Sequence, residues 1–335
     1  MRRLPNECEE PVYSEYSVTA TKLRGKSLPF TVVGALALLG ALAILAVGVA
    51  GCGSSAPSGG TRGGTLPIVA AENFWGSIAG QLAGSRGQVE SIITNPHTDP
   101  HDYEPTAQDA RKLSGARLVI ENGIGYDPWA DRLLGASSVA GRAVINVGEV
   151  VGVKAGGNPH QWYSPDSVHK VIAQITADLK TLDAKDASYF DQQRQLFETK
   201  SLAPYDALIS DIKAKYAGTP IGASEGIMAP LAQALGLDLL TPESFLNAIS
   251  EGTEPTAQNK ATIDQQIKTK QIKVYIYNSQ NAIPDIQAQV AAAQAAGIPV
   301  VTITETLEPA TATFQDWQTA QLTRIEAALA QATGK

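Results

Sequence analysis

Short apolar and often β-branched runs alternate with helical patterns along most of this chain. The runs cover residues 66–71, 88–94, 117–121, 219–223, 274–277 and 300–304. Apolar residues at helical spacing occur between several of them. This alternation predicts an α/β fold whose strands are mostly parallel.

One helix is predicted with particular clarity, beginning at Pro165. Ser164 suits the N-cap position, and Pro165 and Asp166 favour the first turn. Apolar residues then recur at helical spacing, at Val168, Ile172, Ile175, Leu179 and Leu182. We expect this face of the helix to pack against a core.

A polar, weakly periodic helical stretch runs from about Lys185 toward Tyr216 and contains Pro204. This pattern suits a connector between lobes better than a core element. With 335 residues, 44% of them apolar, the chain is long enough for two lobes of ordinary size. We expect an N-terminal lobe over 65–184, a connecting helix over 185–217 and a C-terminal lobe over 218–335.

The motif Glu-Pro-Thr-Ala-Gln occurs once in each expected lobe, at residues 104–108 and 254–258. Both copies are typical of a helix start, and Asp109, three residues after Thr106, strengthens the first copy. Two explanations remain open. The copies share capping chemistry alone, or they belong to a pseudo-symmetric pair of lobes.

The beginning of the chain has the character of a targeting segment. Basic residues precede an almost wholly apolar stretch over 28–49, in the order typical of a signal sequence. The stretch ends at Cys52 after two small residues, which resembles the lipobox of bacterial lipoproteins. We expect a signal sequence over 1–51, a lipid anchor on Cys52 and a flexible tether over 52–64.

The alternative is an uncleaved transmembrane helix, because about 20 apolar residues suffice to span a membrane. In either case the folded body would face outward, on the extracytoplasmic side of the bacterial cell membrane.

Charge and cysteine content narrow the classes of function. The formal net charge is −7, which disfavours nucleic acid as a partner. Both cysteines, Cys8 and Cys52, lie in the N-terminal sixth of the chain. The folded body therefore lacks a disulfide framework and a thiolate metal cage, so any metal must bind through histidine and carboxylate.

Three of the four histidines fall in two proline-rich loops. The prolines disfavour helix and fix the backbone that presents an imidazole, which lowers the ordering cost of a binding site. His101 and His160 are therefore candidate metal ligands, although a loop histidine can also be simply exposed. We expect His97 to be an outer-shell or capture residue and His169, on a helix flank, to be solvated.

Two acidic residues follow predicted strands: Glu225 after residues 219–223 and Glu305 after residues 300–304. Ligands of open α/β sheets gather beyond the carboxyl ends of the strands. His101 also lies between a strand and a helix, and His160 lies just before the helix at Pro165. We expect these four side chains in a cleft, two from each lobe, with helix capping as the alternative role for the carboxylates.

Four segments resemble successive signatures of the zinc/manganese solute-binding lipoproteins of ABC importers, the cluster A-I proteins. The segments are residues 99–106, 158–162, 224–226 and 302–306. The resemblance covers essentially the whole mature chain and implies two lobes joined by one long helix.

The resemblance also implies metal ligands, which fall here on His101, His160, Glu225 and Glu305. The two histidines stand in specific motifs, whereas other acidic residues compete for the last two positions. These competitors are Glu251, Glu254 and Glu308. We expect the side chains of Tyr103 and Trp162 to form packing walls beside the site.

The cargo implied by the family is Zn²⁺ or Mn²⁺, which the protein would deliver to the membrane permease of an ABC importer. Four ligands suit Zn²⁺, and bidentate carboxylates would favour Mn²⁺. We expect a monomer and no enzyme. Two other classes remain open: an extracellular metallohydrolase, which needs an open coordination position and a base, and a metal-binding adhesion lipoprotein.

Overall fold

The computed structural model describes residues 65–96, 98, 100 and 103–335. The predicted signal sequence, Cys52, the tether, His97 and His101 lie outside these residues. Within the described ranges, no helix combines the length and apolar character that crossing a membrane requires.

The N-terminal lobe is built on a parallel sheet with strand order β2-β1-β3-β4. Its strands are β1 (Leu66–Glu72), β2 (Gly87–Ile93), β3 (Leu118–Glu121) and β4 (Ala143–Asn146). Its helices are α1 (Asn73–Ala83), α2 (Ala107–Gly115), α3 (Pro128–Ala136), α4 (Val147–Val151) and α5 (Pro165–Leu182), with short 3₁₀ turns η1 (Gly84–Arg86), η2 (Gln161–Tyr163) and η3 (Ala184–Asp186).

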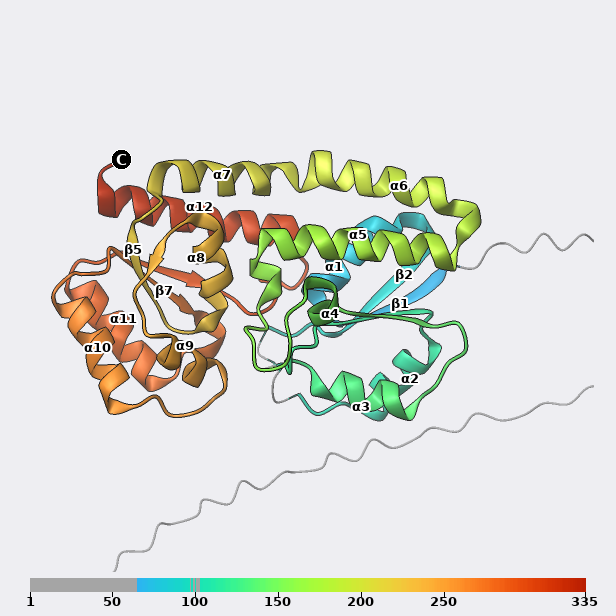
Figure 1. Ribbon diagram of the computed structural model, residues 1–335, viewed down its shortest axis with the longest axis horizontal. Helices are drawn as coiled ribbons and strands as arrows, with labels where there is room; N and C mark the ends of the chain where they lie inside the picture. The colour runs from blue at the N-terminus through green and yellow to red at the C-terminus, as the bar shows by residue number, and fades with distance from the viewer. Residues whose placement is uncertain (1–64, 97, 99, 101–102) are drawn as a thin grey trace, which may run out of the picture. The chain divides into compact units, whose positions relative to one another are not determined.

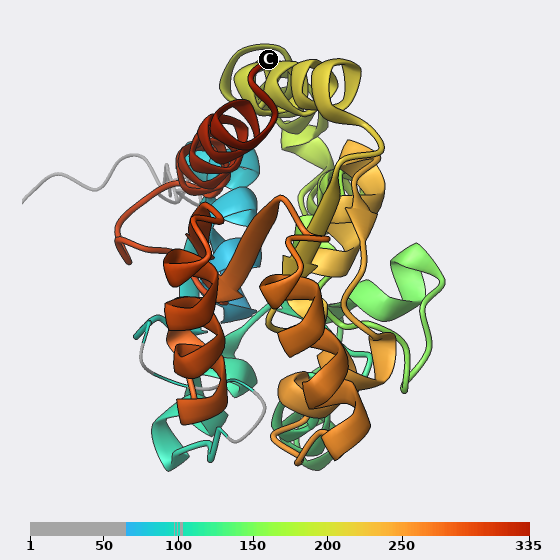
Figure 2. The ribbon, with the colours of Figure 1, turned by 90° about the vertical axis from the view of Figure 1, so that its left-hand side faces the viewer.

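The C-terminal lobe repeats this topology, with parallel strand order β6-β5-β7-β8. Its strands are β5 (Pro220–Ala223), β6 (Asp238–Leu239), β7 (Val274–Asn278) and β8 (Val300–Ile303). Its helices are α8 (Ala229–Leu235), α9 (Glu243–Ser250), α10 (Ala257–Lys268), α11 (Pro284–Ala295) and α12 (Phe314–Thr333), with 3₁₀ turns η5 (Gly226–Met228) and η6 (Ser279–Asn281). Figure 2 shows helices on both sides of this sheet.

The predicted α/β class with two mostly parallel sheets is confirmed, and all six predicted strands are present. Two strands were not predicted. β4 lies at a sheet edge, and its Val144 is 44% exposed, which weakens the apolar pattern. β6 has only two residues. The helix expected from Pro165 is α5, whose N-cap Ser164 accepts a bond from the backbone N–H of Ser167.

The chain passes between the lobes through α6 (Ala187–Leu196), a π-helical turn η4 (Phe197–Ser201) and α7 (Ala203–Tyr216). Figure 1 shows α6 beside α5 and α7 beside α12. Contrary to expectation, this segment is also a core element, because Phe190, Phe197 and Tyr205 are buried. The π turn changes the helical phase, which explains the weak period in the sequence.

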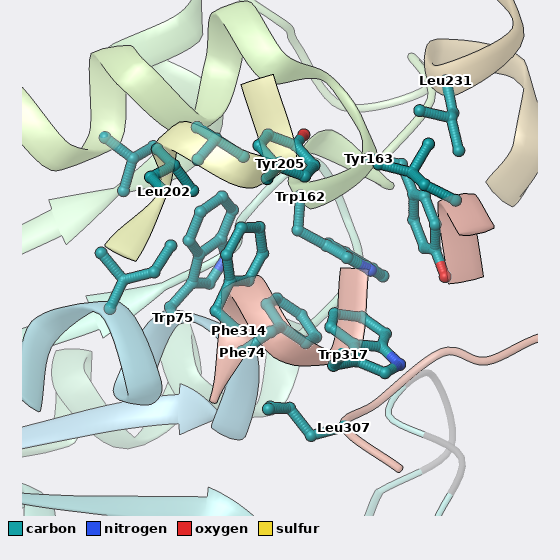
Figure 3. Packing of buried hydrophobic residues seen from close by; sticks show 14 of the residues in the cluster. Phe74, Trp75, Trp162, Tyr163, Leu202, Tyr205, Leu231, Leu307, Phe314 and Trp317 are labelled. Carbon is teal, nitrogen blue, oxygen red and sulfur yellow. The ribbon is translucent and has the colours of Figure 1, made fainter. Parts of the chain in front are cut away.

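One hydrophobic core contains residues of both lobes. Figure 3 shows the rings of Phe74, Trp162, Phe314 and Trp317 gathered within it. The ring of Phe74, on α1, stacks on that of Trp162, in η2, with centroids 4.0 Å apart. Phe314 and Trp317 come from α12. Separating the lobes widely would expose these rings to water, which is unfavourable.

The repeated motif occupies equivalent places in the two lobes. Thr106 is the N-cap of α2, which lies between β2 and β3 along the chain, and Thr256 is the N-cap of α10, between β6 and β7. Asp109 completes a capping box with Thr106. Since the sheets have the same strand order, the motif fits the pseudo-symmetric explanation better than shared capping chemistry alone.

Candidate metal centre

A pocket of about 100 Å³ collects three predicted metal ligands, His160, Glu225 and Glu305. The remaining lining residues are Pro96, Thr98, Pro100, Ile249, Ser250, Gly252, Asn278, Gln280 and Asn281. They come from both lobes. This volume is large enough to hold an ion.

The imidazole of His160 is buried, with 1% of the residue exposed. Its Nδ1 lies 2.9 Å from Oδ1 of Asn158, and its Nε2 lies 3.2 Å from Oε1 of Glu305. With the ring neutral and its hydrogen on Nδ1, Nε2 and the carboxylate oxygen are both acceptors. A proton or a metal ion between them removes the resulting repulsion. Two atoms bound to one tetrahedral ion at about 2.1 Å lie about 3.4 Å apart.

The carboxylate of Glu305, just beyond β8, is held from several sides. Oε1 accepts a hydrogen bond from the hydroxyl of Tyr126 at 2.9 Å. Oε2 accepts one from Nδ2 of Asn278 at 3.0 Å. The backbone N–H of Glu305 donates to Oε1 of Gln280 at 2.8 Å. Neighbouring donors thus fix the orientation of this carboxylate, as is common for metal ligands.

The carboxylate of Glu225, beyond β5, is also buried. Oε2 accepts a bond from Nδ2 of Asn281 at 2.9 Å, whereas Oε1 accepts none from the described residues. Burial and the charge of Glu305 raise the pKa of Glu225, and hydrogen bonds with neighbouring amides offset part of this rise. The resulting pKa is about 7. Glu225 precedes η5 but makes no capping bond, so the capping alternative fails for it.

The competing acids do not line this pocket. Glu251, Glu254 and Glu308 are all exposed. Glu254 instead pairs with Lys260 at 3.0 Å. The geometry therefore favours Glu225 and Glu305 over their sequence neighbours.

His169 is less solvated than expected. Its Nε2 lies 3.1 Å from Oδ1 of Asp206 on α7, and this hydrogen bond raises the pKa of His169. It lies on α5, outside the pocket, and contributes to the contact with the connecting segment.

Of the two aromatic residues expected beside the site, Trp162 lies there and Tyr103 does not line the pocket. Trp162 is fully buried, with its ring centroid 5.3 Å from that of His160, so it forms a wall behind the imidazole. Tyr103 is not among the pocket residues. Its hydroxyl donates to Oδ2 of Asp109 at 2.8 Å, and its ring packs edge-on against Trp129.

In the part of the chain that the structure describes, no group of three or more His, Cys, Asp or Glu side chains is arranged to hold an ion by itself. The predicted ligand His101 lies outside the described residues. Its loop nevertheless borders the pocket through Pro96, Thr98 and Pro100.

The matching registers of the two sheets relate Glu225 to a buried acid of the N-terminal lobe. Ala70 pairs with Ile120 between β1 and β3, and Ala223 pairs with Ile276 between β5 and β7. Glu72 stands two residues after Ala70, as Glu225 stands two residues after Ala223.

Glu72 is fully buried, and its environment differs from that of Glu225. Burial, followed by the charge of Asp127, raises the pKa of Glu72 well above its usual value. Asp127 accepts bonds from the backbone N–H groups of Asn122 and Gly123, both at 2.7 Å. Neither carboxyl oxygen of Glu72 has a hydrogen-bond partner among the described residues.

Sequence reasoning missed the polar residues that contact the predicted ligands: Tyr126, Asn158, Asn278 and Asn281. Asn278 could have been found, because it follows the predicted strand 274–277 as the acids follow theirs. Asn158 lies only two residues before His160, which it contacts, so this contact is local. The contacts of Tyr126 and Asn281 join residues 179 and 56 positions apart and depend on the approach of distant segments.

A protein-family model described as ZnuA, zinc-uptake complex component A, periplasmic, matches residues 68–328. The metal ABC transporter substrate-binding lipoprotein FimA of Streptococcus parasanguinis is 26% identical over 257 residues, 70% of this chain and 78% of FimA. The iron-binding protein YfeA of Yersinia pestis is 30% identical over 168 residues, 48% of this chain and 53% of YfeA.

Among solved structures, a manganese-bound variant of a periplasmic metal-binding protein from Candidatus Liberibacter asiaticus matches with a TM-score of 0.67. The match covers 79% of this chain and 100% of that chain at 20% sequence identity. At this identity the likeness establishes the fold.

Proposed function

Because the chain belongs to the periplasmic zinc-uptake component A family, we propose that it captures a divalent transition metal, Zn²⁺ or Mn²⁺, and delivers it to the permease of an ABC importer. The ligands would be His101, His160, Glu225 and Glu305. The metal is cargo, and the protein itself catalyses no reaction.

One observation carries the proposal. An imidazole from one lobe and two carboxylates from the other line a single small pocket, and the loop that bears His101 borders it. Burying two carboxylates so close together is unfavourable unless a cation or a proton compensates their charge. Oε1 of Glu225, which accepts no hydrogen bond from the residues that the structure describes, offers one oxygen to such an ion.

Metal titration of the full chain tests the assignment. We expect the wild-type chain to bind one equivalent of Zn²⁺ or Mn²⁺ and His160→Ala and Glu225→Ala to lose most of that affinity. The matched controls are His169→Ala and Glu254→Ala, which replace the same residue types outside the pocket. Unchanged binding in both site variants would refute the ligand assignment.

Delivery is tested in cells that lack this protein. We expect uptake of Zn²⁺ or Mn²⁺ from micromolar medium to fall, and wild-type chain but not Glu225→Ala to restore it. If uptake is unchanged while adhesion to host surfaces is lost, the adhesion alternative is correct and the transport proposal fails.

We place the protein on the extracytoplasmic face of the cell membrane as a monomer. The signal sequence 1–51 would be removed and Cys52 acylated, with residues 52–64 as the tether. Lobes 65–184 and 218–335 and connector 185–217 would form the receptor body. Mass spectrometry of the N-terminal peptide should find lipid on Cys52. A chain that retains residues 1–51 would instead support the transmembrane alternative.

A further inference from the structure

The side chain of Asn158 contacts both lobes at the pocket. Its Oδ1 accepts hydrogen bonds from the backbone N–H and from Nδ1 of His160, both at 2.9 Å. Its Nδ2 donates to the carbonyl oxygen of Gly226 at 2.7 Å. Gly226 directly follows Glu225, so one amide joins the segments that carry two candidate ligands from different lobes.

These contacts fix the orientation of the amide without any assumption about the imidazole. A backbone N–H can only donate, and a backbone carbonyl can only accept. The oxygen of the amide must therefore face His160 and its nitrogen must face Gly226. Since Oδ1 can only accept, the hydrogen of the neutral imidazole must be on Nδ1, which leaves the lone pair on Nε2, the atom that faces Glu305.

The backbone of Gly226 is held by both lobes. Its N–H donates to Oγ of Ser250 at 3.0 Å within the C-terminal lobe. Its carbonyl oxygen accepts from Nδ2 of Asn158, which belongs to the N-terminal lobe. A Cβ at Gly226 would lie 3.1 Å from Oγ of Ser250 and 3.3 Å from Nδ2 of Asn158, so glycine permits this close approach.

We propose that Asn158 is a positioning residue for metal capture: it selects the Nε2-ligating tautomer of His160 and ties the Glu225–Gly226 segment to the same amide. Asn158 acts through its neighbours and does not touch the metal. This inference rests on the proposed function. In metal sites, loss of a group that orients a ligating imidazole typically costs 10- to 100-fold in affinity.

Substitution of Asn158 should leave the fold intact. The backbone around it has other partners, because Nε2 of Gln161 donates to the carbonyl oxygen of Asn158 and Nδ2 of Asn122 donates to that of Pro159. Asn158 also borders a neighbouring pocket of about 510 Å³, from which water can replace its bonds.

Two variants separate the two roles. Asn158→Ala removes both contacts. Asn158→Asp keeps an acceptor for Nδ1 of His160 but presents a second oxygen, which cannot donate, to the carbonyl of Gly226. The matched control is Asn259→Ala, which removes an exposed asparagine bonded to Oγ of Ser244 at 2.8 Å.

The first measurement is the imidazole tautomer of the metal-free full chain in detergent, by long-range ¹H–¹⁵N spectroscopy. The chain has only four histidines, and His160→Ala identifies the signal. At a pH at which the ring of His160 is neutral, we expect hydrogen on Nδ1 in the wild-type chain, Asn158→Asp and Asn259→Ala, and a mixture of tautomers in Asn158→Ala.

The second measurement is Zn²⁺ affinity at fixed pH, by competition with a chelator. We expect a loss of about 10- to 100-fold in Asn158→Ala, a smaller loss in Asn158→Asp and none in Asn259→Ala. An unchanged tautomer in Asn158→Ala, or an affinity equal to that of Asn259→Ala, would overturn the inference. If the wild-type chain binds neither Zn²⁺ nor Mn²⁺, the proposed function fails, while the tautomers still decide the role of Asn158 at His160.

Discussion

At the scale of single residues, each of the candidate ligands in the pocket, His160, Glu225 and Glu305, is held by a neighbouring amide side chain. Asn158 orients His160, Asn281 donates to Glu225 and Asn278 donates to Glu305. Neutral amides can orient charged ligands without adding charge to the pocket. The net negative charge that remains favours a cation over an anion or a neutral ligand.

The proposed role of Glu225 as a ligand predicts a pH dependence of metal binding. The pKa of Glu225 is raised to about 7, and a metal must displace the proton that the carboxyl holds below this value. We expect apparent Zn²⁺ affinity to fall by up to about tenfold for each pH unit below 7 from this group alone. Competition titrations between pH 5.5 and 8 measure the slope. A slope that is identical in Glu225→Gln would show that another group controls the dependence.

Glu72 makes a prediction about stability. An acid whose pKa is higher in the folded than in the unfolded chain stabilises the fold at low pH and loses this contribution as the pH rises toward the folded pKa. Glu72→Gln removes the titration and keeps a neutral side chain of nearly the same size. We expect this variant to gain stability over wild type between pH 5 and 8, by at most about 1.4 kcal/mol per pH unit.

Urea unfolding at several pH values measures that gain, with the exposed Glu308→Gln as control. A constant difference between Glu72→Gln and wild type across this range would contradict a proton held by Glu72.

At the scale of elements, the same five-residue motif begins a helix in each lobe, but the two caps differ in strength. The hydroxyl of Thr106 accepts from two backbone N–H groups, and Oδ2 of Asp109 accepts from the backbone N–H of Thr106. Thr256 accepts from the backbone N–H of Asn259. The capping box of α2 therefore satisfies more of the helix N-terminus than the simple cap of α10.

We expect Thr106→Ala to lower the free energy of unfolding by about 1 to 2 kcal/mol and Thr256→Ala by about 1 kcal/mol or less. Chemical denaturation midpoints measure both losses. Thr323→Ala, inside α12, is the matched control and should be neutral or slightly stabilising, because alanine has the higher helix propensity. Equal losses at Thr106 and Thr256 would mean that the box adds nothing beyond the cap.

At the scale of the whole described body, the two sheets share one aromatic core, and α12 of the C-terminal lobe packs against α1 of the N-terminal lobe. Hydrogen bonds also cross between the lobes: the hydroxyl of Tyr163 donates to the carbonyl oxygen of Thr304 at 2.8 Å. Such a body favours small rearrangements at the pocket over wide opening of the lobes.

The shared core predicts cooperative unfolding. Phe74→Ala, in the N-terminal lobe, should cost about 3 to 5 kcal/mol because it removes a ring stacked on Trp162. We expect one unfolding transition and reduced hydrogen-exchange protection in both β3 and β7. Reduced protection confined to β3 would show instead that the lobes unfold independently.

The sequence alone determined the α/β class, six of the eight strands and the position of α5, because these depend on local period and capping. It also singled out Glu225 and Glu305, since residues that follow parallel strands reach the same sheet edge, and His160 through its proline-rich loop. Short or exposed strands such as β6 and β4 were missed because few residues carry their pattern.

Only the tertiary structure decided which groups meet in the pocket. The bonds from Tyr126 to Glu305 and from Asn158 to Gly226 join residues 179 and 68 positions apart, and no local pattern encodes such a contact. It also separated Tyr103 from the pocket and made α7 part of the core. The reason is physical: local spacing sets which face of an element is apolar, whereas the packing of both lobes around one core sets which polar ends come together.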